Sequence, residues 1–85
     1  MKIRFGDITS SEIAVMLEAS SESGEPLAES ILVKKKGNWF DLTNSEAEYL
    51  RDNLNGDADR VAQACGDAAG RAFEKAGEKL DQLIQ

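Results

Sequence analysis

The feature that most constrains the fold lies in the last third of the chain, where residues 57–85 follow a helical period. At 3.6 residues per turn, the apolar side chains of this segment fall within an arc of about 140°. These side chains belong to Ala58, Val61, Ala62, Cys65, Ala69, Ala72, Phe73, Ala76, Leu80, Leu83 and Ile84. The pattern predicts one long amphipathic helix that continues to the end of the chain.

Glycines lie along this predicted helix. Each interior glycine costs about 1 kcal/mol relative to alanine, so several of them indicate that another backbone comes close. One interpretation is a homodimer in which two copies of the helix meet. The other is that small residues let the helix pack tightly on the sheet of its own chain. The residues of the predicted helix interface are Ala62, Gly66, Gly70, Phe73 and Gly77.

The first half of the chain shows the alternation of apolar residues that is typical of strands. Strands are predicted around residues 3–5, 13–17, 27–33 and 39–42, with turn-forming residues between them. The expected fold class is therefore α+β: an antiparallel three- or four-stranded β-meander, followed by a short helix and a long C-terminal helix packed on one face. We expect a single domain over 1–85, with the meander in 1–42 and the helical part in 43–85.

The short helix is predicted from its end signals. Thr43 and Glu46 have the spacing of a capping box, in which each side chain accepts a hydrogen bond from the other residue's backbone amide. Asn55 and Gly56 provide a stop, and Asp57 would cap the long helix. The expected core consists of Ile3, Phe5, Ile13, Val15, Leu17, Ile31, Val33, Phe40, Leu42, Leu50, Leu54, Val61, Cys65, Ala72, Phe73, Leu80 and Leu83.

Composition indicates which partners the chain prefers. Its 85 residues include 16 acidic and 10 basic side chains, which gives a net charge of −6. A negative chain repels nucleic-acid backbones and anionic membranes, so we expect no direct nucleic-acid partner and no membrane partner. The expected partner is a protein with a basic surface.

The sequence also predicts a compartment. No segment reaches the roughly 18 apolar residues of a membrane span, and residues 1–5 lack the apolar stretch of a signal peptide. Cys65 is the only cysteine, so no intrachain disulfide can form. Its place in the apolar stripe predicts a buried thiol in a reducing compartment. We expect a cytoplasmic protein, in its own cell or in that of a host.

Residue types that commonly act in catalysis are scarce, so we expect that the chain is not an enzyme. It has no histidine, which removes the commonest general base and metal ligand. Gly66 and Gly70 do not follow a strand, so they form no phosphate cradle. The glycine at position 56 could suit a calcium loop, but Arg51 and Ala62 then stand at ligand positions. We therefore expect no catalytic residue, no metal and no cofactor.

Surface acids suggest a function in binding. Carboxylates can imitate phosphate charges and occupy a cationic groove on another protein. Acids in a first helical turn also interact favourably with the helix dipole, which needs no partner. The three lysines at 34–36 could contact a phosphate or an acidic peptide, or could discourage pairing at a sheet edge. The predicted partner-binding acids are Glu46, Glu48, Asp52, Asp57 and Asp59.

Size, acidity and the expected meander-then-helix order make the chain similar to the small phage-encoded inhibitors of bacterial defence systems, including some anti-CRISPR proteins. The resemblance covers the architecture of residues 1–85 and assigns no functional residue. It implies a non-enzymatic inhibitor or regulator, a DNA mimic in one version, that occludes its partner sterically or electrostatically in the host cytoplasm. The alternative is a homodimeric structural or adaptor module, assembled through the long C-terminal helix, with no inhibitory role.

Overall fold

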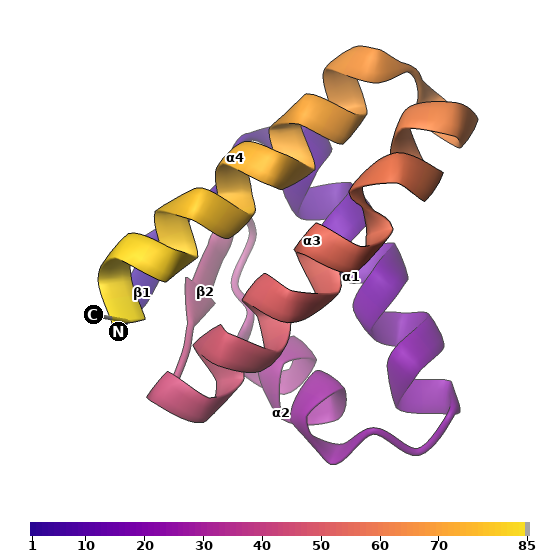
Figure 1. The fold of residues 1–85 in the computed structure, drawn as a ribbon. Coiled ribbons are helices and arrows are strands. Elements are labelled where there is room, and N and C mark those ends of the chain that lie inside the picture. The colour runs from indigo at the N-terminus through magenta and orange to yellow at the C-terminus, as the bar shows by residue number, and fades with distance from the viewer. Residues whose placement is uncertain (85) are drawn as a thin grey trace. The chain divides into compact units, whose positions relative to one another are not determined.

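The computed structural model describes residues 1–84. The chain forms two compact units, Met1–Glu46 and Ala47–Gln85. Helices account for 77% of the chain. The order of the elements is β1 (Lys2–Arg4), α1 (Asp7–Glu22), α2 (Pro26–Lys34), β2 (Trp39–Asp41), α3 (Asn44–Cys65) and α4 (Asp67–Ile84) (Figure 1).

The predicted meander over 1–42 is wrong, because its two middle strands are helices. The run Ile13, Val15 and Leu17 alternates, yet Val15 is 61% exposed whereas Ile13 and Leu17 are fully buried. Ile13, Met16 and Leu17 form the buried side of α1, which is the i, i+3, i+4 spacing of a helix. A short apolar run fits both periods, and here the helical period holds.

The outer two predicted strands exist and pair directly with each other. β1 and β2 form an antiparallel two-stranded sheet with the register Lys2↔Asp41, Ile3↔Phe40 and Arg4↔Trp39. Ile3 and Phe40 are buried, so the other four side chains of the register lie on the outer face. A bridge between Lys36 and Trp39 closes the turn before β2.

The predicted capping box is confirmed at the start of α3. The Thr43 amide donates to Glu46 Oε1 at 2.8 Å, and the Glu46 amide donates to Thr43 Oγ1 at 3.2 Å. The predicted stop at Asn55–Gly56 is wrong, since α3 runs through both residues to Cys65. Helix propagation across one glycine costs only about 1 kcal/mol, which tertiary packing can offset.

The predicted continuous helix over 57–85 is also wrong, because it breaks at Gly66. This glycine has φ +101°, a left-handed conformation, and separates α3 from α4. Its amide donates to the Ala62 carbonyl at 3.0 Å, as in the usual glycine ending of a helix. The helical period therefore spans two helices that fold back on each other as a hairpin (Figure 1).

Small residues line the contact between the two helices of this hairpin. A Cβ placed on Gly70 would lie 2.6 Å from Ala62 Cβ and 3.0 Å from the Ala58 carbonyl oxygen. A Cβ on Gly77 would lie 2.6 Å from Asn55 Oδ1. At Gly70 the backbone of α4 thus approaches α3 more closely than a side chain would allow, whereas at Gly77 the nearest atom is the tip of the Asn55 side chain, which can turn away.

We expect Gly66→Ala to lower the free energy of unfolding by about 1 kcal/mol, because alanine is strained at positive φ. No atom lies within 4 Å of a Cβ at this position, so the cost comes from the backbone alone. Gly66→Asn should recover part of the loss, since asparagine tolerates the left-handed region. Urea denaturation measures both variants, and a neutral alanine variant would contradict the backbone argument.

Most of the predicted core is buried. The buried members are Ile3, Phe5, Ile13, Leu17, Ile31, Phe40, Leu42, Leu50, Leu54, Val61, Phe73 and Leu80. Five predictions are wrong: Val15, Val33, Leu83 and Cys65 are exposed, and Ala72 is half-buried. Because the thiol of Cys65 is exposed, the prediction of a buried structural cysteine is wrong. Among the described helices, none has the length and apolarity that a membrane crossing requires.

Candidate functional site

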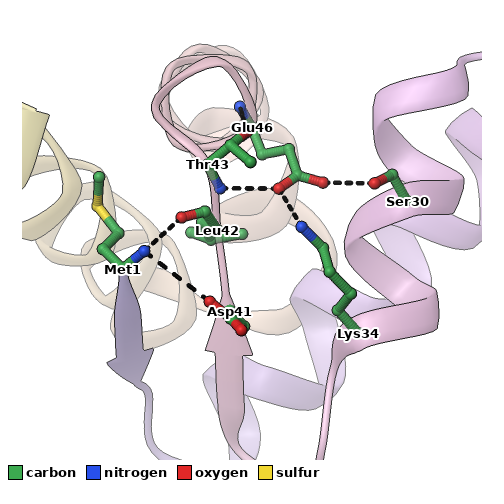
Figure 2. A network of polar contacts seen from close by, with 7 residues as sticks. All are labelled: Met1, Ser30, Lys34, Asp41, Leu42, Thr43 and Glu46. Carbon is green, nitrogen blue, oxygen red and sulfur yellow. Dashed lines mark hydrogen bonds and ion pairs between the residues drawn. The ribbon is translucent and has the colours of Figure 1, made fainter.

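The best-connected polar side chain in the unit Met1–Glu46 is that of Glu46 (Figure 2). Its carboxylate accepts hydrogen bonds from Ser30 Oγ at 2.6 Å and Lys34 Nζ at 2.5 Å. The Thr43 amide is the third donor. The side chain is only 2% exposed. Glu46 therefore joins α2 to the start of α3.

The surroundings of Glu46 favour its charged form. Burial by itself would raise the pKa of this carboxyl, because a charge is poorly solvated inside a protein. Hydrogen bonds from Lys34, Ser30 and Thr43 outweigh burial and lower the pKa to about 2. Glu46 is thus a buried structural carboxylate, and the prediction that it lies on a partner-binding surface is wrong.

The other four predicted partner-binding acids do not form one surface. At 100° per residue, Glu48, Asp52 and Asp59 lie within about 40° of each other on α3, whereas Asp57 lies on the opposite side. Asp57 is also half-buried and is paired with Arg60 at 2.8 Å. Three acids on one stripe therefore remain from the predicted set.

An arginine lies beside the stripe of acids on α3. Arg51 contacts Asp52 at 3.2 Å and Asp81 of α4 at 2.9 Å. Hydrogen bonds to Asp52 and Asp81 raise the pKa of Arg51. The side of α3 that carries these acids is therefore a mixed surface of acids and arginine, and its negative potential is weakened.

The predicted helix-interface residues lie mainly inside the hairpin. Gly70 and Gly77 are buried against α3, and Phe73 is 1% exposed. Ala62 is half-buried at the Gly70 contact, and Gly66 is exposed at the break between the helices. The close approach that the glycines indicate is made by a helix of the same chain. The interpretation that the glycines pack on a sheet is therefore wrong, because they pack on the helix α3.

A stronger charge asymmetry lies in the first unit. Residues 5–33 contain six acids and no lysine or arginine, which equals the net charge of −6 of the whole chain. This segment includes α1 and most of α2. Counting lysine and arginine along the sequence would have found it, but strand prediction split the segment among three separate elements.

The outer face of α1 combines these acids with exposed apolar side chains. Ile8 and Val15 are 73% and 61% exposed and are two turns apart on one line of the helix. Glu18 and Glu22 are exposed on the same side. We call this the α1 face: its residues fall within an arc of about 100°, and they are Ile8, Ser11, Val15, Glu18, Ala19 and Glu22.

Half of the basic residues lie in the same unit, all of them outside residues 5–33. Lys2 and Arg4 lie on the outer face of β1, Lys34 ends α2, and Lys35 and Lys36 lie between α2 and β2. Lys35 Nζ lies 5.6 Å from the centroid of the Phe40 ring. The lysine cluster therefore does not lie at the end of a long strand, as the sequence pattern indicated, but leads from a helix into a short strand.

Among the described residues, no group of three or more acids and cysteine could hold a metal ion. No family model matches the chain, and the comparisons with curated proteins and with solved structures found no match.

Proposed function

We propose that the chain is a non-enzymatic protein-binding module that occludes a basic surface on another protein. The α1 face would make the contact, with Ile8 and Val15 at its centre and Glu18 and Glu22 at its rim. Protein interfaces commonly have an apolar centre surrounded by charged residues. The observation that carries the proposal is the exposure of two large aliphatic side chains on one line of a helix without a single cation.

The position of Glu22 gives independent support. It lies in the last turn of α1, where the helix has no basic residue. The C-terminal end of a helix dipole is negative, and a carboxylate there costs about 0.3–1 kcal/mol. Glu22 thus weakens the helix in which it stands, and an attractive contact with a cationic partner would offset that cost.

Occlusion would be both steric and electrostatic. The net charge of the segment 5–33 would steer the α1 face toward a positive surface and speed the encounter at low ionic strength. The apolar centre would then slow dissociation, because removing aliphatic surface from water is favourable. A phage-encoded inhibitor that covers the nucleic-acid groove of a defence protein would act in this way. The resemblance to such inhibitors now depends on size and acidity, since the chain has no meander.

The double substitution Ile8→Ser and Val15→Ser tests the proposal. Affinity capture from a bacterial lysate, followed by mass spectrometry, should recover a partner with a basic surface on the wild-type chain. Loss of these two apolar side chains should weaken binding by about 2 kcal/mol, or roughly thirty-fold, when calorimetry measures the purified chain with its purified partner. Glu18→Lys with Glu22→Lys should also weaken binding, and more strongly at low salt.

Val33→Ser is the matched control. Val33 is 79% exposed, more than Ile8 or Val15, but lies on α2 outside the α1 face. It should leave the affinity unchanged. Equal loss from Val33→Ser and from the double substitution would show that exposed apolar residues bind without specificity, and this would refute the α1 face as the binding site.

A further inference from the structure

A groove of about 400 Å³ opens in the unit Met1–Glu46. This volume is in the range of small-molecule sites, which measure about 300–1,000 Å³. The groove lies beside the two-stranded sheet and the end of α2. The residues that line it are Lys2, Lys34, Lys36, Trp39, Phe40 and Asp41.

The groove is positive although the chain is acidic. Its lining contains three lysines and one carboxylate, that of Asp41. Lys34 is engaged with Glu46, whereas Lys2 and Lys36 are exposed. Lys2 and Asp41 are opposite each other in the sheet register. An anion that enters the groove can therefore approach two solvent-facing ammonium groups.

Trp39 gives the groove an exposed aromatic wall. It is 52% exposed, on the outer face of β2. Its backbone is held in place, since the Lys36 amide donates to the Trp39 carbonyl and the Trp39 amide donates to the Lys36 carbonyl, both at 2.9 Å. The backbones of Trp39 and Lys36 are thus fixed side by side. The cross-strand neighbour of Trp39 is Arg4, a third cation on the same face.

We propose that this groove binds a small anion that carries an aromatic ring, of the nucleoside phosphate class. The ring stacks on Trp39, and the phosphate contacts the ammonium groups of Lys2 and Lys36. Stacking of a base on an aromatic side chain is favourable, and so are lysine contacts to phosphate. A ligand that makes both contacts must carry a ring and a phosphate in one molecule. A long polyanion is disfavoured relative to a mononucleotide, because the six acids of residues 5–33 repel each further phosphate.

Trp39 provides the readout, because it is the only tryptophan of the chain. Titration with adenosine monophosphate should quench its fluorescence with saturation, at a Kd of about 10–100 µM for a ligand of this size. Adenosine and ribose 5-phosphate each carry half of the recognition and should bind at least about ten-fold more weakly. A short single-stranded DNA should not bind more tightly than the mononucleotide.

Lys36→Gln should weaken the binding of adenosine monophosphate by about five- to ten-fold, and Lys75→Gln, on the exposed part of α4, should not change it. Calorimetry repeats each titration without depending on fluorescence. The proposal is overturned if adenosine monophosphate gives no saturable signal by either method or if Lys36→Gln binds like the wild type. Tighter binding of the DNA would overturn it too, in favour of a nucleic-acid surface.

Discussion

A leucine at Gly70 should lower the free energy of unfolding by about 3 kcal/mol or more. A Cβ at this position already lies 2.6 Å from Ala62 Cβ and 3.0 Å from the Ala58 carbonyl oxygen. Neither atom can turn away, since one is the whole side chain of alanine and the other belongs to the backbone. The helices α3 and α4 must separate to admit a side chain, and overpacking of this kind costs about 1–3 kcal/mol even for small additions. Urea denaturation followed by circular dichroism measures the loss.

Gly70→Ala and Gly56→Ala form a matched pair. Both glycines lie inside helices, and alanine gains about 1 kcal/mol of helix propensity at either position. No atom lies within 4 Å of a Cβ at Gly56, so that variant should be stabilised, whereas Gly70→Ala should lose about 1–2 kcal/mol. Adding Ala62→Gly to Gly70→Ala should recover part of the loss. If both glycine variants are stabilised alike, the close approach of the two helices is refuted.

Local signals predicted the fold only where one signal had one structural meaning. The capping box was correct because the spacing of Thr43 and Glu46 lets each side chain accept from the other residue's amide, a pattern typical of the start of a helix. The run from Ile13 to Leu17 was misassigned, because five residues cannot distinguish a strand from a helix that is buried on one side. Pro26 lies in the turn predicted between the strands at 13–17 and 27–33, but it begins α2, a position for which the fixed φ of proline is well suited.

The break in the C-terminal helix was equally ambiguous in the sequence. The apolar stripe continues in phase across Gly66, because both helices of the hairpin bury the same kind of face. Only the left-handed φ of this glycine separates them, and Gly56 stands in a similar context without ending its helix. A glycine inside a helical pattern indicates that the helix can end there at a small cost in free energy, and tertiary packing decides whether it does.

The candidate sites differ in how far the sequence could reveal them. Glu46 was recognised as a capping residue, but its burial depends on Ser30 and Lys34, which reach it only after the segment before them folds as α2. The groove beside Trp39 depends on the pairing of β1 with β2, two strands that the predicted meander kept apart. Residues distant in the sequence make both sites, and no local pattern records such pairings.

Replacing Glu46 with glutamine should lower the free energy of unfolding by about 2–3 kcal/mol at pH 7. The folded state holds the pKa of Glu46 near 2, below its ordinary value of 4.5. A group with a lowered folded pKa adds stability above its unfolded pKa, and that stability disappears as the pH falls from about 4.5 to 2. Because each tenfold change in proton affinity is worth about 1.4 kcal/mol, the full contribution is about 3 kcal/mol. Urea denaturation at pH 7 and at pH 2 measures it.

The pH dependence separates the charge of Glu46 from its packing. Glutamine keeps the shape of the side chain: its carbonyl oxygen can still accept from the Thr43 amide, and its NH2 group can donate to Ser30 Oγ. The variant and the wild type should therefore converge in stability near pH 2. Glu48→Gln, two residues further along α3 and exposed, should change stability by less than about 0.5 kcal/mol at either pH. A Glu46→Gln variant that remains less stable by the same amount at both pH values would mean that shape, and not the ionised carboxylate held by Lys34, joins α2 to α3.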